Sequence, residues 1–337
     1  MPPIIDQTRP DQTRPDQTRP DQTSLLSQIP SVAVIMSTYN GEKYLSEQID
    51  SILAQKDVHV ELFIRDDGST DNTRNIISDY AEHHRNIHVS YGTNVGFARS
   101  FIQELLVASG FEYYAFSDQD DFWLEDKLIK AVEAIKREEA MNISKIPVIW
   151  HSNLYVSDAS LNIIRKTKLH TRVRSLESLI FRRSIPGCTT VMNSEARNLA
   201  GHKYISALIS SRGHENCIFY ILYLMGGKVI CSPEAYIYYR QHSHNTIGSP
   251  ITFKARIIRE YKKLFKWQHG SEAGAAQKIL QEYADELNPK ARKTLTLIAS
   301  HKDNWISRLR IVLSPKFRTG DFRLTVVGKI RALFGWL

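Results

Sequence analysis

Apolar segments that alternate with amphipathic segments constrain the fold of this chain more than any other feature. Four short apolar runs are typical of buried strands, at residues 31–38, 60–66, 87–91 and 112–118. Each is followed by a segment of helical periodicity, at residues 42–55, 70–84, 95–109 and 125–140. Strands that alternate with helices in this way predict an α/β domain with a doubly wound, mostly parallel sheet.

Further strands are predicted beyond this first half. Residues 147–158 and 187–193 read as strands, and residues 161–184 between them as an excursion on the acceptor side of the domain. A helix is expected from about His214 to Met225, where two glycines end it. Residues 228–231 and 235–239 then return as strands.

Polar residues gather where the predicted strands end. The first strand breaks at Tyr39, the second ends in Asp66 and Asp67, and the fourth runs into a loop that contains Asp118 and Asp120. In an open parallel sheet the carboxyl ends of the strands face one crevice, where ligands bind. The sequence therefore predicts a ligand site at this edge of the sheet.

Three carboxylates in the loop after the fourth strand indicate a metal site. Alternation along an extended chain puts Asp118 and Asp120 on one side. Paired hard oxygen ligands suit Mg²⁺ or Mn²⁺, with phosphate oxygens and water completing the shell. Adjacent acids also occur in solvated turns. Asp121 is either a further ligand or the cap of the helix that starts near Leu124.

Four segments in this order and spacing resemble the donor half of the family 2 glycosyltransferases. They are STYNGE (37–42), RDDGSTDNT (65–73), NVGFA (94–98) and SDQDD (117–121). The resemblance spans residues 31–125 and continues more weakly to about residue 248. DQDDFW (118–123) and YYRQHSHN (238–245) are most similar to the rhamnosyltransferase-like bacterial enzymes of surface polysaccharide assembly.

This resemblance implies the A-type glycosyltransferase fold and a division of the chain. Residues 30–250 would form the glycosyltransferase domain, with a donor half at 30–125 and an acceptor half at 126–250. Thr38, Tyr39 and Asp67 are then expected to line the base and ribose pocket of a nucleotide-diphosphate sugar, together with Asp66. An N-cap role for either aspartate is the alternative.

The remaining site residues follow from the same resemblance. Asp118 is expected to contact the ribose or the metal, and Asp120, Asp121 and His242 to hold Mg²⁺ or Mn²⁺. Arg240 and His242 would sit on a loop that folds over the diphosphate, or on a solvated polar loop. Glu215 occupies the position of the catalytic base, where the family more often has aspartate. A first-turn residue favoured by the helix dipole is the competing interpretation of Glu215.

The predicted reaction is inverting, metal-dependent glycosyl transfer from dTDP-rhamnose or a UDP-sugar to a hydroxyl of a cell-surface polysaccharide or lipid-linked glycan precursor. A single displacement needs one base and no protein nucleophile. A nucleotidyltransferase is an alternative, but it should carry a basic Gly-rich loop after the first strand. A non-catalytic nucleotide-sugar binding module is the other alternative, and the acid at every expected position argues against it.

Composition sets the broad class. No apolar stretch approaches the roughly 20 residues of a spanning helix, and the N-terminus lacks the regions of a signal peptide. Cys188, Cys217 and Cys231 are widely spaced and are interpreted as reduced core thiols of a cytoplasmic protein. The repeat DQTRP in residues 1–29 lacks apolar residues, so this segment is predicted to be disordered.

Positive charge is concentrated in a C-terminal region at residues 251–337, which holds 18 Lys+Arg against 7 Asp+Glu. As a helix, residues 323–337 would align an apolar stripe of Leu324, Val327, Ile330, Phe334 and Leu337. Such a basic helix would contact the inner face of the cell membrane or pack on the catalytic domain. Nucleic-acid binding is disfavoured, because no recognised motif or aromatic stacking platform accompanies the charge.

Overall fold

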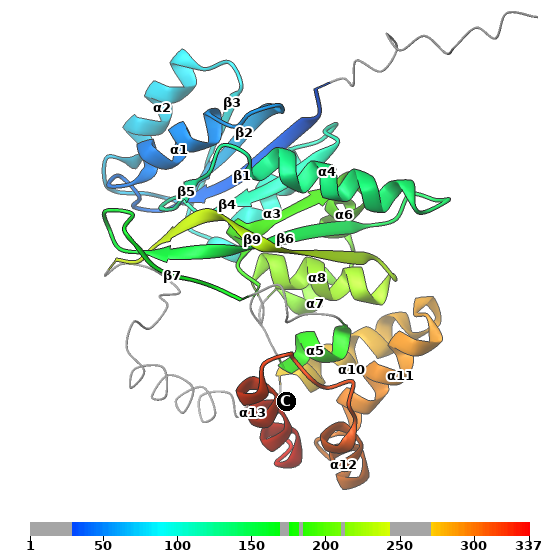
Figure 1. Ribbon diagram of the computed structural model, residues 1–337. Coiled ribbons are helices and arrows are strands. Elements are labelled where there is room, and N and C mark those ends of the chain that lie inside the picture. Colours follow the sequence, from blue (N-terminus) through cyan, green and yellow to red (C-terminus); the bar gives the residue numbers. More distant parts are fainter. Residues whose placement is uncertain (1–28, 169–174, 182–184, 210–212, 243–270) are drawn as a thin grey trace, which may run out of the picture.

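The computed structural model describes residues 29–168, 175–181, 185–209, 213–242 and 271–337 (Figure 1). The DQTRP repeat and the end of the YYRQHSHN segment, residues 243–245, lie outside the described residues. The predictions made for them therefore stay predictions.

The first half of the sheet is parallel. It contains β1 (Ser31–Thr38), β2 (His59–Asp66), β3 (Ile87–Tyr91) and β4 (Tyr113–Ser117) in the spatial order β3-β2-β1-β4. The intervening helices are α1 (Leu45–Leu53), α2 (Thr73–His83) and α3 (Phe97–Val107). Because parallel neighbours require a crossover connection, each helix returns the chain to the same end of the sheet. All three strand ends that carry the predicted polar residues consequently meet at one edge.

The second half of the sheet is mixed. Its strands are β5 (Phe122–Trp123), β6 (Val148–Ser157), β7 (Ile163–Lys166), β8 (Thr190–Asn193) and β9 (Lys228–Arg240). β8 runs antiparallel to both β4 and β6, whereas β9 runs parallel to β6. β5 and β7 pair antiparallel with β9 and β6. The prediction of a doubly wound α/β fold is confirmed, and β8 is where the parallel pattern is interrupted.

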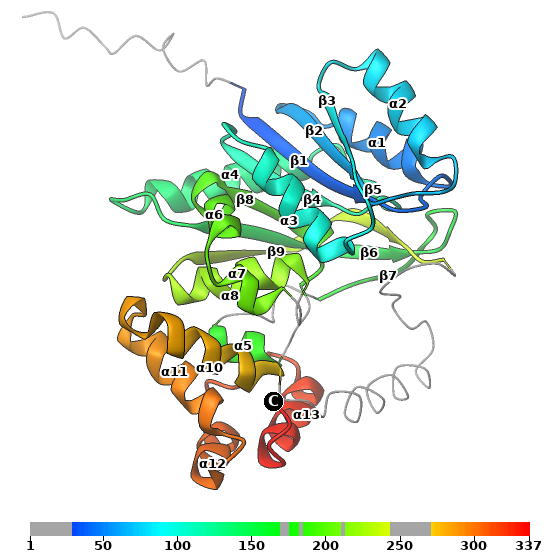
Figure 2. The same cartoon turned by 180° about the vertical axis from the view of Figure 1, so that it is seen from behind.

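Strand alternation divides the core into two layers. Val32, Val34 and Met36 of β1 face one cluster, and Ala33 and Ile35 face the other. The first cluster is covered by α1, α2 and α4 (Lys127–Ala140), and the second by α3, α6 (Ser194–Asn198) and α8 (His214–Leu224). Figure 2 views the molecule from the side that α3, α6 and α8 cover. Burial on both faces explains why the strands read as continuous apolar runs.

Two strand predictions differ in detail from the structure. Residues 187–189 form a 3₁₀ turn, and only Thr190–Asn193 are a strand. The two predicted returns at 228–231 and 235–239 form the single strand β9, whose register against β6 shifts near Asn153. Pro233 lies at this irregularity and lacks the N–H that regular pairing requires.

The described part of the C-terminal region, residues 271–337, is helical, as predicted. It contains α10 (Ser271–Tyr283), α11 (Pro289–Ser300), α12 (Trp305–Leu313) and α13 (Phe322–Leu333). These helices join the layer of α8 through α5 (Leu176–Phe181) and α7 (Ile205–Leu208). Among the helices that the structure describes, none is both long enough and apolar enough to cross a membrane.

The apolar stripe expected along residues 323–337 does not form. α13 ends at Leu333, and Gly335 adopts a φ of +73°, a left-handed conformation that glycine tolerates. The turn sends Leu337 into the core, where it is 1% exposed and donates its N–H to Nε2 of His301 at 3.1 Å. Of the expected stripe, Ile330 and Phe334 stay exposed, whereas Leu324 and Val327 are partly buried.

Candidate active site

Side chains join the ends of β1 and β2 where the sheet ladder stops. Asn40, at a φ of +48°, accepts the backbone N–H of Thr70 at 2.8 Å and donates its own N–H to Oγ of Ser69. The N–H of Gly41 reaches Oγ1 of Thr73 at 2.8 Å. These bonds fix the turn after β1 against the start of α2.

Asp66 and Asp67 are both buried and bonded within the protein. Asp66 accepts the N–H groups of Gly68 and Ser69 and the Nε–H of Arg74, the last at 2.7 Å. Asp67 accepts Arg65 at 2.8 Å and the N–H groups of the loop before α3 at residues 95 and 96, both at 3.0 Å. Asp66 therefore organises the turn after β2, as the capping alternative anticipates. Asp67 ties β2 to the NVGFA segment.

At the end of β1, a buried hydroxyl group is left without a hydrogen-bond partner among the described residues. Thr38 is fully buried, and its Oγ1 has no hydrogen-bond partner among the described residues. Tyr39 beside it is about half exposed. Gln119 holds the backbone of Tyr39 on both sides: its Oε1 accepts the N–H of Tyr39 at 2.8 Å, and its Nε2 donates to the C=O of Tyr39 at 3.1 Å. Gln119 thus attaches the acidic loop to the end of β1.

The acidic loop brings Asp120 and His242 together. Nε2 of His242 lies 2.8 Å from Oδ2 of Asp120, although 122 positions separate them in sequence. The imidazole also lies over Tyr44 at the start of α1, with ring centroids 5.0 Å apart. Two of the three predicted metal ligands therefore share one place in the fold.

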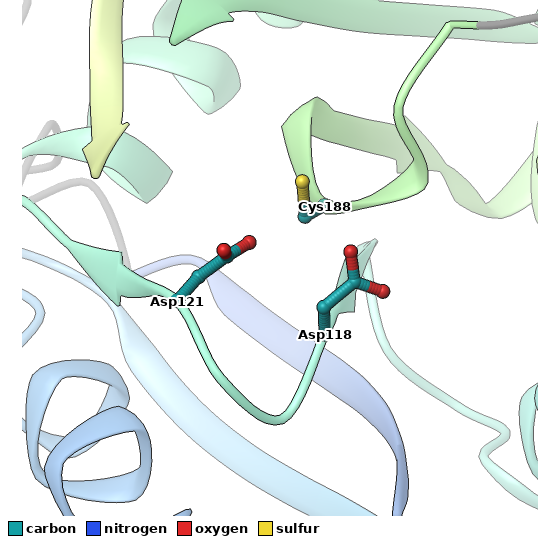
Figure 3. Close-up of side chains that lie close together, drawn as sticks. All are labelled: Asp118, Asp121 and Cys188. Atoms are coloured by element: carbon teal, nitrogen blue, oxygen red, sulfur yellow. The ribbon is translucent and has the colours of Figure 1, made fainter. Parts of the chain in front are cut away.

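Asp121 turns away from this pair into a buried pocket. One ligand atom each of Asp118, Asp121 and Cys188 lies within 4.8 Å of the other two. Figure 3 shows these three side chains close together. Oδ1 of Asp121 accepts the N–H of Arg240, and its Oδ2 has no partner among the described residues. The N-cap of α4 is Asp126 and not Asp121, and the predicted role of Asp121 as a metal ligand stays a prediction.

A buried lysine completes the pocket. Lys127, at the start of α4, is fully buried, and its Nζ lies 2.9 Å from the centroid of the Trp123 ring. Burial lowers the pKa of Lys127 well below its ordinary value. Burial, followed by the charge of Asp120, raises the pKa of Asp118 to about 7 and that of Asp121 in the same direction. The pocket therefore favours neutral groups until a cation or donor enters it.

Arg240 is a buried strut between three parts of the site. Its Nε donates to the C=O of Asp120 at 3.0 Å, and one terminal nitrogen donates to the C=O of Ala159 at 2.5 Å. The other terminal nitrogen pairs with Glu47 of α1, and the guanidinium lies 4.4 Å from the Tyr44 ring centroid. The guanidinium contacts protein groups in this structure, so its predicted contact with the donor stays a prediction.

Glu215 lies in the first turn of α8, beside the loop that carries Cys188. A Cβ added to Gly187 would stand 2.9 Å from Nε2 of His214 and 3.7 Å from Cβ of Glu215. Gly187 thus packs against the helix start, and the next residue, Cys188, faces Asp118. The Gly187–Cys188 step connects the predicted base to the acidic loop.

Burial decides the protonation of this pair. Burial raises the pKa of Glu215 to about 8 and outweighs the hydrogen bond from its own backbone N–H, which acts in the opposite direction. His214 is stacked on Phe101 at 4.0 Å between ring centroids, and burial lowers its pKa to about 3. Nδ1 of His214 is 3.3 Å from Oε2 of Glu215 but lacks hydrogen-bond geometry. Because its pKa is low, the imidazole beside the carboxyl group is neutral.

The chain was compared with known proteins. The family model described as glycosyl transferase family 2 matches residues 33–189. A dTDP-rhamnosyl transferase of Shigella flexneri, RfbG, is 30% identical over 242 residues, which cover 69% of this chain and 80% of that protein. The chain belongs to glycosyltransferase family 2. It is a glycosyltransferase, and the family expected from the four sequence segments is confirmed.

Solved structures support the A-type fold of this glycosyltransferase. The crystal structure of S. aureus TarS, residues 1–349, superposes with a TM-score of 0.52 at 19% identity and covers 90% of this chain and 81% of that chain. The same protein in complex with UDP-GlcNAc gives a TM-score of 0.52 at 17% identity, with the same coverage. At such identity the likeness extends to the fold alone.

Sequence reasoning missed several residues that shape the site of this glycosyltransferase. Gln119 stands inside the DQDD motif, where only its position between two acids could have drawn attention to it. Cys188 was expected to be a core thiol, and it is buried, but its acidic neighbours were not foreseen. Lys127, Tyr44 and Glu47 carry no local signal, because their partners lie far away in sequence.

Replacing Glu215 should change how stability depends on pH. A carboxyl group whose pKa is raised on folding destabilises the folded state as pH rises from its ordinary value of 4.5 to about 8. Glu215→Gln stays neutral, so it should gain stability over wild type by about 2–4 kcal/mol at pH 9 and by little at pH 5. Urea unfolding at several pH values measures this difference. Glu82→Gln, at an exposed position on α2, is the matched control.

Arg240→Met should destabilise the fold by about 2–4 kcal/mol, because it removes a buried cation whose acceptors lie on three separate segments. Urea unfolding again provides the measurement. Lys56→Met removes an exposed ion pair with Glu125 and should cost no more than about 1 kcal/mol. Equal losses in the two variants would show that Arg240 is not a strut.

Proposed function

We propose that this glycosyltransferase is an inverting, metal-dependent enzyme. It would move a sugar from a nucleotide diphosphate to a hydroxyl of a cell-surface polysaccharide or a lipid-linked glycan precursor. The observation that carries the proposal is the Gly187–Cys188 step, which brings Glu215 beside the loop of Asp118 and Asp120. A base and a group of metal-binding carboxylates at one strand edge are what such a displacement needs.

A pyrimidine nucleotide is the donor that we propose, with dTDP-rhamnose ahead of UDP-sugars. The buried Oγ1 of Thr38 and the half-exposed Tyr39 offer a polar and a stacking contact at the end of β1. Asp66 and Asp67 already accept backbone N–H groups, so they would serve the base pocket through its shape as well as through their charge. The 30% identity to a dTDP-rhamnosyl transferase supports rhamnose as the sugar.

The residues at the acidic loop fit Mg²⁺ or Mn²⁺. Asp120 and His242 supply oxygen and imidazole ligands at one position, and Asp118 adds a half-buried carboxylate. Oδ2 of Asp121, for which the described residues provide no hydrogen-bond partner, is a further buried acceptor beside Cys188. A bound divalent cation would offset the negative charge that develops on the leaving diphosphate. We propose Asp120 and His242 as its main ligands.

Glu215 is the base that we propose. As the acceptor oxygen bonds to the anomeric carbon and the bond to the diphosphate oxygen breaks, the hydroxyl proton passes to the Glu215 carboxylate. A raised pKa makes that carboxylate a stronger proton acceptor than an exposed glutamate would be. The neutral His214, stacked among phenylalanines, limits the positions that the carboxyl group can take.

Donor binding provides the first test. dTDP and dTDP-rhamnose with Mn²⁺ should raise the melting temperature of the protein more than GDP-mannose does, because a purine needs a larger pocket. Asp120→Ala should lose the metal-dependent part of this shift while its own melting temperature stays near that of wild type. Preferential stabilisation by GDP-mannose would remove the proposed donor. An equal shift in EDTA would remove the proposed metal site.

Glu215→Gln should bind the donor normally and lose roughly 10²- to 10⁴-fold in turnover, as is typical for removal of a general base. In wild type, kcat/KM should rise with pH through a value near 8, because the reactive form is the carboxylate. That acidic limb should be absent from the residual activity of the variant. His214→Ala serves as comparison and should cost less. Wild-type turnover in Glu215→Gln would exclude this residue as the base.

A further inference from the structure

The outer sides of α12 and α13 form an apolar surface that no other described segment of the chain covers. α12 buries Ser307 and Ile311, and the opposite side exposes Trp305, Ile306, Leu309 and Leu313. The spacing of these four residues, over positions i, i+1, i+4 and i+8, forms one stripe along the helix. Leu313 is 77% exposed, so most of its side-chain surface contacts solvent.

α13 repeats this arrangement. It buries Gly328, Arg331 and Ala332 against α5 and the core. Its opposite side exposes Phe322, Val326, Ile330, Leu333 and Phe334, with Phe322 83% exposed. α12 and α13 pack on one another, and both views place them at the lower end of the molecule, away from α2 (Figures 1 and 2). We call these nine side chains the C-terminal apolar face.

Both helices are firmly held in the positions that present this face. Asn304 caps α12 by accepting the N–H of Ile306 at 2.9 Å, and Asp321 caps α13 by accepting the N–H of Arg323 at 3.0 Å. Leu337 is bonded to His301, and Arg308 donates to the C=O of His301 at 2.9 Å. The exposed apolar side chains therefore lie on well-anchored helices and not on frayed ends.

The charge around the face identifies the chemistry of its partner. Residues 302–337 contain eight Lys+Arg and two Asp+Glu, a net charge of +6. Arg310, Lys316, Arg318 and Arg323 are exposed on or between the two helices. The partner must accept apolar and aromatic side chains and carry negative charge beside them. A second copy of this face would bring two sets of +6 together, so like charges oppose that pairing.

We propose that the C-terminal apolar face docks on a lipid bilayer that contains anionic headgroups. Side chains such as Phe322 and Leu313 would enter the boundary between headgroups and acyl chains, and the exposed arginines and lysines would contact lipid phosphates. Neither helix would span the bilayer. This inference goes beyond the transfer reaction and rests on no residue of the catalytic site.

Vesicle binding tests the proposal. Purified full-length protein should co-sediment with phosphatidylcholine vesicles that contain phosphatidylglycerol, and much less with phosphatidylcholine alone. The double variant Leu313→Glu, Phe322→Glu should weaken binding at least roughly tenfold, because it places carboxylates at the two most exposed apolar positions of the face. Arg310→Gln with Arg323→Gln should remove most of the preference for phosphatidylglycerol and its sensitivity to salt.

A matched control tests whether any exposed apolar residue would act in the same way. Met141 and Ile143, after α4, are strongly exposed at a site remote from this face, and Met141→Glu, Ile143→Glu should bind vesicles as wild type does. All three double variants should keep the wild-type melting temperature and the same nucleotide-induced shift, which separates this result from any failure of the proposed function.

Two results would overturn the proposal. One is unchanged vesicle binding by Leu313→Glu, Phe322→Glu in folded protein. The other is light scattering that shows a wild-type dimer which this variant converts to monomer while vesicle binding stays the same. That second result would assign the face to a second copy of the chain.

Discussion

The site depends on how the chain satisfies its backbone where three parallel strands stop. Strand ends lose their ladder partners, and buried N–H groups without acceptors are costly. Here the acceptors are side chains: Asn40 after β1, Asp66 and Asp67 at the end of β2, and Gln119 after β4. The residues that terminate the sheet are thus the same residues that shape the edge, and neither task can change without the other.

A second consequence of burial concerns charge. Asp118, Asp121, Lys127 and Cys188 occupy a small volume, and each has its pKa moved toward the neutral form. Glu215, one loop away, is moved in the same direction. The surrounding fold keeps these groups away from water, although their charged forms are more stable when hydrated. A ligand that brings positive charge would find acceptors already oriented and weakly solvated.

Much of the fold could be predicted from local pattern. The first four strands and their helices appear within a few residues of the predicted bounds, because apolar runs and helical periodicity are properties of neighbouring residues. The direction of β8 and the joining of residues 228–240 into one strand could not be predicted, because they depend on pairing across the sheet. The stripe at residues 323–337 was wrong because a periodicity argument does not see Gly335 end the helix.

The site was predictable to the extent that it lies on strand ends. Asp120 and His242 could be placed together only through the resemblance to a family, since 122 positions separate them. The sequence does not predict that Arg240 is a buried strut. A cation near acidic motifs suggests a contact with the diphosphate, and only the structure shows that it donates to backbone C=O groups instead. Glu47 and Tyr44 complete that arrangement from α1, and no pattern around either residue marks it as part of the site.

α13 lies so near α5 that a side chain at position 328 would overlap the aromatic ring of Phe181. Glycine at position 328 and phenylalanine at position 181 are therefore matched in size. A homologue that carries alanine or a larger residue at position 328 must have a smaller one at position 181, or must place its last helix elsewhere. The size of the side chain at position 181 therefore limits what position 328 can carry while α13 stays against α5.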